Sequence, residues 1–530
     1  MTKLFYKHKH VAILVLVIAI AVFFRFWQFN AIPPGLYQDE AMNGADALSS
    51  LKTGEFKVFY TNNNGREGMI VWLDALAIKF FGAVPMALRL FPALAGILAV
   101  LGLYFLTKEL FNLQVALASS FFMAVSFWAV NFSRMGFRAG LMPMFLIWSF
   151  YFLLHGLRLS KLLILRIDSN IFNFVIAGIL FGLGFYTYIS YRFASVLIVA
   201  FFILYLIKHR IKSLWSGFAI FTVVAFIIAL PIGLYFLNNQ GDFFGRSGQV
   251  SIFSADNPLK AVAISIVATL GMFNVAGDFN WRHNFAGSPQ LFLPVGILFI
   301  LGILICAKRR NLSDKFLFLW FFIFLLPNIL STEGNPHALR SLGAMPSAMI
   351  FSGIGLVWLY EKMKNYFNNK IADSSLIKYR QQLLRIKKEA FLLLIILLFF
   401  VSFAEFNKYF VKWASNVRTA DAFSQNQVEL ANYLNSLPAD TEKYVIWDAS
   451  DRATDNGLPV SAQTVHFLTA EKIRINYLKS DEFDKIKFGE SVTVIAPIYF
   501  NLDLLHSLNK KYSGSVVKII GLNVGVVIVP

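Results

Sequence analysis

The sequence has little charge and almost no cysteine. Of its 530 residues, 15% are charged, 57% are hydrophobic and one, Cys306, is a cysteine. A soluble globular chain carries about 25% charged residues, so this composition excludes an ordinary soluble protein. A lone cysteine excludes an intrachain disulfide and a zinc site built from several cysteines. The composition indicates an integral membrane protein.

Acidic residues are scarce too, with 30 against 48 basic ones and a net charge of +18. The lysines and arginines gather in short stretches between apolar runs, as in the cytoplasmic loops of membrane proteins. We therefore interpret the basic balance as membrane topology and expect no nucleic-acid partner. The apolar runs approach the roughly 20 residues of a spanning helix and lack the alternation of spanning β-strands.

We expect an α-helical polytopic fold with about eleven membrane-spanning helices. The first, residues 11–27, follows a basic N-terminus and has no signal-peptide cleavage site. It should stay as an uncleaved helix that enters from the cytoplasm. The other predicted spans are residues 88–107, 112–130, 139–157, 171–188, 193–207, 214–237, 291–306, 316–330, 342–360 and 390–405.

Residues 69–81 read MIVWLDALAIKFF and are short for a span, with Asp74 and Lys79 among them. If this segment lies flat at the interface, the basic loops all fall on the cytoplasmic side; if it crosses, they all fall outside. We expect the flat helix. The N-terminus is then cytoplasmic and the C-terminus outside, in a multi-pass protein of the cytoplasmic (inner) membrane.

The composition changes after residue 405. An amphipathic helical pattern appears in QNQVELANYLNSL, and β-like runs appear in YVIWD, KIRINYL, SVTVIAPIY and SVVKIIGLNVGVVIVP. We expect a transmembrane domain over residues 1–405 and a small extracytoplasmic α/β domain over residues 406–530.

Two adjacent carboxylates, Asp39 and Glu40, follow a Pro-Pro-Gly turn in the loop after the first span. A carboxylate near the low-dielectric membrane boundary can have its pKa raised toward the working pH, which suits a general base. The same pair could instead cap the helix that AMNGADALSSL predicts. Both interpretations stay open on the residues alone.

Arg66 and Glu67 come later in this loop, after a flexible Asn and Gly stretch and directly before the interfacial helix. Arginine pairs bidentately with phosphate, and helix N-termini offer free amides to anions. Arg66 is therefore placed to meet a lipid phosphate at headgroup depth. The alternative is anchoring to any anionic lipid.

Further arginines lie at the predicted outer ends of spans, against the positive-inside bias. Arg134 and Arg138 are four residues apart in NFSRMGFRAGLMP, and Arg192 lies near Tyr188 in YTYISYRF. An anionic ligand such as phosphate or pyrophosphate explains the arginines, while anchoring in the aromatic belt explains the tyrosine.

Two later loops bring histidines and acids. GDFNWRHNFAGSP contains Asp278 and His283, and STEGNPHALRSLGAMP contains Glu333, His337 and Arg340. Two histidines with nearby carboxylates could bind a divalent cation, but a fixed ligand spacing such as HExxH is absent. The sequence therefore leaves the cofactor open.

Taken in order, these features resemble the GT-C class of glycosyltransferases. The first span is followed by a loop with Asp-Glu, then by a charged motif and an apolar helix ending in Phe-Gly, and Arg-Leu begins the next span. The sequence is similar to bacterial relatives of the dolichyl-phosphate-mannose protein mannosyltransferases and of the aminoarabinose lipid A transferase. The similarity covers roughly residues 10–360 and is strongest over 34–110, with PHALRSLGAMP and YTYISYRF adding to it.

The resemblance implies an inverting glycosyltransferase that takes a hexose or pentose from a polyprenyl-phosphate-linked donor. Its acceptor would be a protein, lipid or glycan at the outer membrane face. It also implies that Asp39, with Glu40 beside it, is the catalytic base. Arg66 would contact the donor phosphate, although GREGM replaces the family's Lys-Pro-Pro. Arg192, Arg340 or a divalent cation could stabilise the leaving phosphate.

Two other functions stay open. A flippase or transporter of a lipid-linked saccharide would have as many spans, but it should carry ionisable residues at mid-membrane, where the predicted spans have almost none. A polysaccharide polymerase or ligase would also use lipid-linked sugar, and the long loop at 238–290 is compatible with that function.

Overall fold

The computed structural model describes residues 2–162, 168–208, 213–470, 472–489, 491–521 and 523–530. The chain forms two compact units. Unit 1 comprises Met1–Trp27, Pro92–Ser133 and Arg138–Lys412, and unit 2 comprises Gln28–Phe91, Arg134–Phe137 and Trp413–Pro530.

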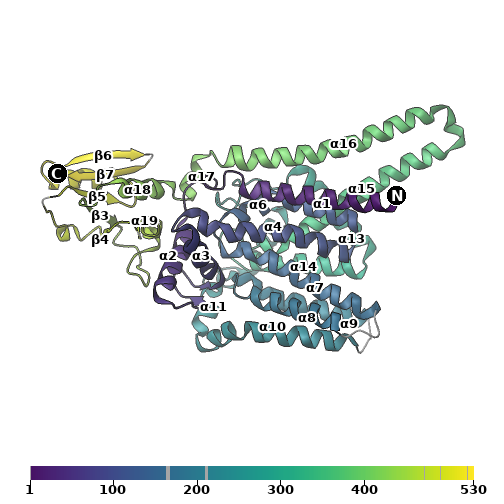
Figure 1. Cartoon of the computed structure of the whole chain (residues 1–530), viewed down its shortest axis with the longest axis horizontal. Helices are drawn as coiled ribbons and strands as arrows, with labels where there is room; N and C mark the ends of the chain where they lie inside the picture. The colour runs from purple at the N-terminus through teal and green to yellow at the C-terminus, as the bar shows by residue number, and fades with distance from the viewer. Residues whose placement is uncertain (1, 163–167, 209–212, 471, 490, 522) are drawn as a thin grey trace. The chain divides into compact units, whose positions relative to one another are not determined.

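Unit 1 holds most of the long helices. α8 packs against both α7 and α10 (Figure 1). α15 packs against α5 and α13. The helices that lie wholly or mostly in this unit are α1 (Thr2–Phe26), α4 (Pro85–Leu110), α5 (Leu113–Val125), α6 (Phe127–Arg134), α7 (Met142–Leu162), α8 (Asp168–Gly184), α9 (Phe193–Lys208), α10 (Ser213–Asn238), α11 (Gln240–Gln249), α12 (Pro258–Gly271), α13 (Leu293–Arg309), α14 (Leu312–Ile329), α15 (Met345–Ala372) and α16 (Arg380–Phe406). Short helical turns join them at η1 (Arg138–Leu141), η2 (Ile189–Arg192), η3 (Ile252–Ser254), η4 (Leu342–Ala344), η5 (Ser374–Tyr379) and η6 (Asn407–Trp413).

The predicted helical membrane fold is confirmed. Among the described residues, 8 helices are long and apolar enough to cross a membrane, or up to 9 if the bent pair α5 and α6 is one span. The two remaining predicted spans fall on α8 and α13, which have 17 residues each and are about 25 Å long. The chain is therefore a multi-pass membrane protein, while the direction in which it crosses stays a prediction.

Two buried charges fix the bend of 57° between α5 and α6. Arg25 donates to the carbonyl oxygens of Ala124 (2.8 Å) and Met123 (3.2 Å), at the C-terminal end of α5. Glu405 accepts from the amide of Phe127 (3.1 Å), the first residue of α6. A guanidinium on the last carbonyls and a carboxyl oxygen on the first amide supply partners that each helix end lacks. The break is thus satisfied internally, away from water.

Two helices lie within the long loop predicted at 238–290. α12 (Pro258–Gly271) begins at an N-cap, where the side chain of Asn257 accepts from the amide of Lys260 at 3.1 Å. Proline at the first helical position fits this start, since that amide needs no partner. α11 (Gln240–Gln249) is short and buries none of its residues.

Unit 2 combines the first polar segment of the chain with its C-terminal part. The first segment forms α2 (Gln38–Thr53), a short antiparallel ribbon of β1 (Phe59–Tyr60) and β2 (Arg66–Glu67), and α3 (Met69–Phe81). The predicted helix at 69–81 is therefore present, while its flat placement at the interface stays a prediction. With 13 residues it is about 20 Å long, too short to span roughly 30 Å of hydrocarbon.

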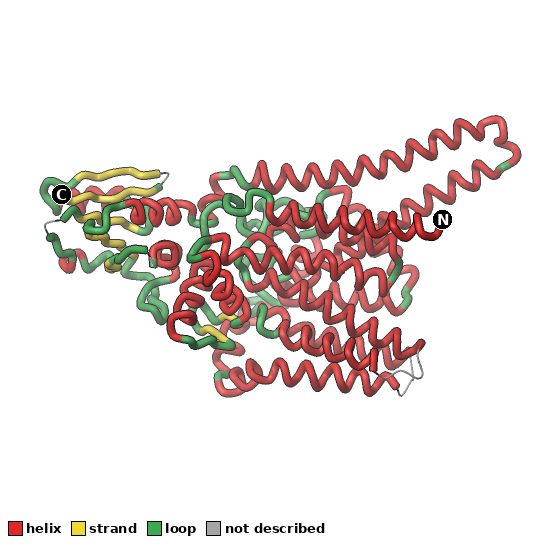
Figure 2. The backbone as a smooth tube through the Cα atoms, viewed as in Figure 1, coloured by secondary structure: helices red, strands yellow, loops and turns green. Residues whose placement is uncertain are grey.

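The C-terminal part of unit 2 is the predicted α/β structure. Five strands form one sheet, drawn in yellow near the C-terminus in Figure 2. Their order is β4-β3-β5-β7-β6, with β3 parallel to β4 and β5 and the other pairs antiparallel. The inner side chains of β3, β5 and β7, such as Ile446, Ile495 and Val527, pack with Leu505 of α20. The elements are α17 (Val417–Ala422), α18 (Gln425–Ser436), β3 (Glu442–Trp447), η7 (Val460–Ala462), α19 (Gln463–Thr469), β4 (Asn476–Lys479), η8 (Phe483–Lys485), β5 (Thr493–Pro497), α20 (Leu502–Lys511), β6 (Val516–Gly521) and β7 (Val524–Val529).

The two parts of unit 2 are joined by close contacts. The hydroxyl of Thr464 in α19 donates to the carbonyl of Leu36 at 3.1 Å. A Cβ on Gly44 of α2 would lie 2.5 Å from the ring of Phe467, so only glycine allows this approach. The C-terminal part and the first polar segment thus pack as one unit. Whether residues 406–530 form a domain of their own stays a prediction.

Candidate functional site

Asp39 lies in the first turn of α2 and is half-buried. Its Oδ1 accepts a hydrogen bond from Asn63 Nδ2 at 2.8 Å, and within the part of the chain that the structure describes it makes no ion pair. Asn63 belongs to the turn between β1 and β2, where it adopts the left-handed conformation with φ of 52°. The turn thus orients the carboxylate while leaving part of it accessible.

The neighbouring Glu40 is fully buried and fixed by several partners. Its two oxygens meet Arg89 Nε and Nη2 at 3.1 Å each, and they accept from the amides of Tyr37 (3.1 Å) and Gly136 (2.6 Å). The bond to Tyr37 caps α2, as the alternative interpretation expected. Glu40 therefore anchors the first polar segment, and Asp39 is the member of the pair that can reach a ligand.

Arg66 is also buried, with 1% exposure. Its guanidinium forms an ion pair with Asp46 and donates to Asn43 Oδ1 (2.7 Å) and the carbonyl of Asn62 (3.3 Å). Burial raises the pKa of Asp46 above its usual value, although Arg66 opposes this shift. Because Arg66 is committed to these partners, a donor phosphate would have to compete for it; its predicted role stays a prediction.

The other predicted residues of unit 2 are buried as well. Glu67 follows Arg66 in β2 and is 3% exposed. Arg134 donates to the carbonyls of Ile32 (2.7 Å) and Gln28 (3.3 Å) and lies over the ring of Phe29. Its charge therefore holds the backbone that leads from α1 into α2, and the structure gives it a structural role.

A polar cavity of about 410 Å³ is lined on one side by residues 61–64 of the turn between β1 and β2. On the other side it is lined by residues 452–455 of the C-terminal part, where the amide of Asp455 donates to Asn62 Oδ1 at 3.0 Å. Amide, hydroxyl and charged groups dominate the lining. Such a cavity suits a hydrated, hydroxyl-rich ligand better than a lipid tail.

In unit 1, Arg192 lies at one end of an apolar groove. Its guanidinium stacks on the rings of Phe243 (4.0 Å) and Phe236 (4.9 Å) and donates to the carbonyl of Phe243 at 2.7 Å. Arg192 lines a cavity of about 760 Å³ that shares Phe185 and Phe226 with a second one of about 600 Å³. Together the two cavities form the apolar groove, which runs along α9 and α10. Nearby, Arg138 lies over the ring of Tyr188, with 5.5 Å to its centroid.

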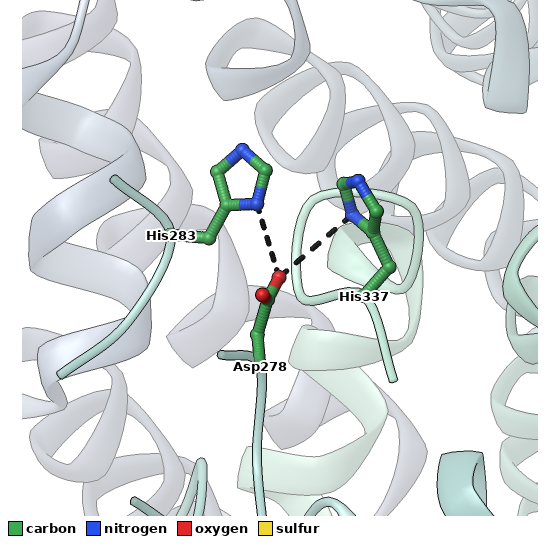
Figure 3. Close-up of side chains that lie close together, drawn as sticks. All are labelled: Asp278, His283 and His337. Carbon is green, nitrogen blue, oxygen red and sulfur yellow. Dashed lines mark hydrogen bonds and ion pairs between the residues drawn. The ribbon is translucent and has the colours of Figure 1, made fainter. Parts of the chain in front are cut away.

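Asp278, His283 and His337 meet in unit 1, although 59 residues separate the first from the last (Figure 3). Asp278 Oδ2 lies 3.0 Å from His283 Nδ1 and 3.9 Å from His337 Nδ1. Burial holds the pKa of His337 well below its usual value, and His283 and Arg340 reinforce the shift by repulsion. Burial therefore favours the neutral form of the His337 imidazole.

The loop that carries His337 is held by a second ion pair. Arg340 is 8% exposed and donates to Glu333 Oε2 (2.7 Å) and to Ser331 Oγ (2.5 Å). Glu333 also meets Arg246 Nη2 at 2.8 Å. The carboxylate of Glu333 thus offsets part of the charge of both arginines beside the histidines.

The partners that hold Arg66 and Glu40 in place were not predicted from the sequence. Asn43 and Asp46 lie four and seven residues after Asp39, so the helical period places all three on one face of α2. This polar face could have predicted Asp46 as a partner of Arg66. The pairing of Glu40 with Arg89, 49 residues away in the sequence, could not be predicted in this way.

Comparisons with known proteins identify the fold of the chain. A family model described as dolichyl-phosphate-mannose-protein mannosyltransferase matches residues 68–235. The crystal structure of ArnT from Cupriavidus metallidurans bound to undecaprenyl phosphate matches with a TM-score of 0.59 and 14% identity, over 97% of both chains. The chain has the GT-C fold. The resemblance seen in the sequence is confirmed.

Other solved structures share the GT-C fold with this chain. ArnT from the same organism in the apo state has a TM-score of 0.55 and 13% identity, and covers 100% of this chain and 98% of that one. The archaeal oligosaccharyltransferase AglB from Archaeoglobus fulgidus, in complex with an inhibitory peptide and a dolichol-phosphate, has a TM-score of 0.52 and 15% identity, with 93% of this chain and 70% of that one covered. No curated protein matches the sequence.

Proposed function

We propose that the protein is an inverting glycosyltransferase. It transfers a sugar from a polyprenyl-phosphate-linked donor to an acceptor hydroxyl on the outer face of the cytoplasmic membrane. One observation carries the proposal: Asp39 is half-exposed and held by Asn63, while its neighbours Glu40 and Asp46 are neutralised by arginines. Asp39 is thus the carboxylate that is free to take a proton.

The reaction needs few groups. Asp39 accepts the proton of the acceptor hydroxyl as its oxygen attacks the anomeric carbon from the face opposite the phosphate. The bond between the anomeric carbon and the phosphate oxygen breaks, and the electron pair leaves with polyprenyl phosphate. Because a phosphate is a good leaving group, no carboxylic acid has to protonate it. A fixed cation that faces the phosphate lowers the barrier by stabilising the growing charge.

The donor requires a site that is apolar along its length and cationic at one end. The groove along α9 and α10 has this form, with phenylalanines along its walls and Arg192 at its end. The ArnT and AglB structures contain undecaprenyl phosphate and dolichol-phosphate, respectively, which supports a lipid phosphate as the donor carrier. Arg192 is the arginine that best suits the phosphate, with Arg340 and Arg66 as further candidates.

The acceptor needs a polar space beside the base. Our candidate is the cavity of about 410 Å³ lined by the β1–β2 turn, whose Asn63 donates to Asp39; its volume is within the range of about 300–1,000 Å³ of small-molecule sites. Its amides and hydroxyls match a hydroxyl-bearing acceptor. The C-terminal part of unit 2 would then help to bind the acceptor, since residues 452–455 form one wall.

Donor turnover tests the proposal. Purified protein is incubated with a panel of polyprenyl-phosphate sugars, with and without candidate acceptors, and release of polyprenyl phosphate is followed. Asp39→Asn should lower turnover by about 10²–10⁴-fold, because the amide cannot take the proton. Asp503→Asn, which changes an exposed acid in the first turn of α20, should have no effect.

Full turnover in Asp39→Asn would exclude it as the base. If no donor is consumed and lipid-linked saccharide instead moves across proteoliposomes, the protein is a flippase.

Topology is checked with a single cysteine at position 39 in a Cys306→Ser background. It should react with a membrane-impermeant thiol reagent from outside, and labelling only from the inner face would reverse the proposed orientation.

A further inference from the structure

A further cavity, of about 200 Å³, lies in unit 1, away from the apolar groove. Its lining comes from the C-terminal halves of α4, α7 and α9 and from the first turns of α14, and all four helices are long and apolar enough to span a membrane. The ends of spanning helices lie at the level of the lipid headgroups. Tyr205, which lines this cavity, is about 20 Å further along the chain of α9 than Arg192. The cavity is therefore separate from the proposed donor site.

The lining of this cavity is amphiphilic. A buried water needs roughly 10–15 Å³ of such volume and two to four polar partners. The cavity is much larger than that and offers few polar groups, which are Glu109, Arg158, Ser313 and the hydroxyl of Tyr205. It therefore suits a ligand that is itself amphiphilic. The apolar residues of the lining are Leu110, Leu154, Leu157, Phe201, Leu312 and Phe316.

Glu109 leaves one carboxylate oxygen unused. Its side chain is 10% exposed, and its Oε2 accepts from Arg158 Nη1 at 3.2 Å and lies 3.6 Å from His155 Nδ1. The other oxygen, Oε1, is buried and has no hydrogen-bond partner among the described residues. A buried acceptor without a partner costs free energy, which a donor from a ligand would recover. Glu109 thus calls for a hydrogen-bond donor in the cavity that it lines.

Arg158 supplies the opposite charge in the same cavity. Its side chain is 62% exposed, and the one ion pair that it makes within the described part of the chain is with Glu109, through Nη1. A guanidinium has five donors in a planar fork, so the remaining ones can still pair with a phosphate. The cavity therefore presents an anion and a cation side by side, at the ends of spanning helices.

We propose that this cavity binds the headgroup of phosphatidylethanolamine, with the ammonium on Glu109 and the phosphate on Arg158. A zwitterion matches the two charges, and the apolar lining matches the start of the acyl chains. A primary ammonium has three donors, which Glu109 Oε1 and the hydroxyl of Ser313 can accept. The quaternary ammonium of phosphatidylcholine has no N–H to donate, and phosphatidylglycerol has no cation. The site thus selects a phospholipid by its headgroup, independently of the proposed reaction.

Native mass spectrometry of the full-length protein in detergent tests this selection. The probes are phosphatidylethanolamine, phosphatidylcholine and phosphatidylglycerol with identical acyl chains. One phosphatidylethanolamine should bind about 10–100-fold more tightly than either of the others, because both lack the charge-assisted hydrogen bond to Glu109. Glu109→Gln should abolish this preference. Glu361→Gln, which changes an acid that pairs with Lys364 outside the cavity, should keep it.

A second variant separates the cavity from its charges. Leu154→Trp places a larger side chain in the lining and leaves Glu109 and Arg158 unchanged, so the tightly bound phosphatidylethanolamine should be lost. This variant also decides the matter if Glu109→Gln fails to fold. Equal affinity of the wild type for the three lipids overturns the proposal, as does a Glu109→Gln or Leu154→Trp protein that keeps the preference.

Free phosphoethanolamine distinguishes a lipid from a soluble ligand of the same chemistry. At the concentration of the lipid it should displace none, because it lacks the acyl chains that contact the apolar lining. Displacement at equal concentration would show that the site binds a soluble phosphoethanolamine, and it would overturn the assignment to a membrane lipid.

Discussion

The first polar segment of unit 2 and the histidine cluster of unit 1 both bury carboxylates, yet they neutralise them differently. In unit 2, Arg89 and Arg66 pair with Glu40 and Asp46. In unit 1, Asp278 faces two imidazoles. An arginine is always charged and offers only donors, so its pairs are complete without any ion. The imidazoles of His283 and His337 carry no such permanent charge. In the first region the arginines therefore neutralise the neighbours of Asp39, whereas Asp278 in the second has only histidine side chains beside it.

The largest effect should come from Glu40→Gln. Arg89 is 1% exposed, and the change leaves its charge buried without a counter-ion. We expect a loss of about 3–5 kcal/mol in the free energy of unfolding. Thermal unfolding in detergent measures it. The double variant Glu40→Gln with Arg89→Met should regain part of the loss, because it removes the unpaired charge. Wild-type stability in Glu40→Gln together with lost turnover would instead make Glu40 catalytic.

Asp74 sharpens the comparison, because among the described residues it makes no ion pair, and Arg66 only opposes the rise of its pKa in part. It is fully buried in α3, neither oxygen has a hydrogen-bond partner among the described residues, and burial raises its pKa well above the usual 3.8. A raised pKa means that the folded state favours the protonated form. The stability of the wild type is thus complete below about pH 4 and is lost as the pH rises through the folded pKa.

Asp74→Asn should remove this pH dependence. The variant should unfold at a higher temperature than the wild type at neutral and alkaline pH, by the equivalent of about 1–3 kcal/mol, and the difference should shrink toward pH 4. Unfolding midpoints measured across the pH range test it, with Asp503→Asn as the exposed control. A difference that grows as the pH falls would reverse the sign and contradict the assignment.

What the sequence could predict follows from local patterns. Hydropathy found the spans, and the short amphipathic run at 69–81 became α3 with the same bounds. The prediction failed where long-range contacts decide. The bend at Ser126 depends on Glu405, and the meeting of Asp278 with His337 depends on how α13 and α14 fold back. The helix that holds Asp39 could be predicted from AMNGADALSSL, whereas the burial of Arg66 depends on the fold. The role of Asp39 stays a prediction.

Arg192 tests whether unit 1 provides the donor site. Arg192→Gln removes the charge at the end of the apolar groove but keeps a polar side chain. We expect the donor KM to rise about tenfold, equivalent to about 1.4 kcal/mol, with kcat little changed. Arg246→Gln serves as the matched control, since that arginine pairs with Glu333. A fall in kcat with an unchanged KM would move Arg192 from donor binding to the transition state.

The smallest effect should come from Asn63→Ala, which removes the hydrogen bond that orients Asp39. A hydrogen bond to a charged group contributes about 1.5–3 kcal/mol when buried, and less here because Asp39 is half-exposed. We expect kcat/KM to fall about three- to tenfold. Asn64→Ala is the control from the same turn, because its side chain is exposed. Equal losses in both variants would show that the turn matters as a wall of the polar cavity, and that Asp39 needs no orienting partner.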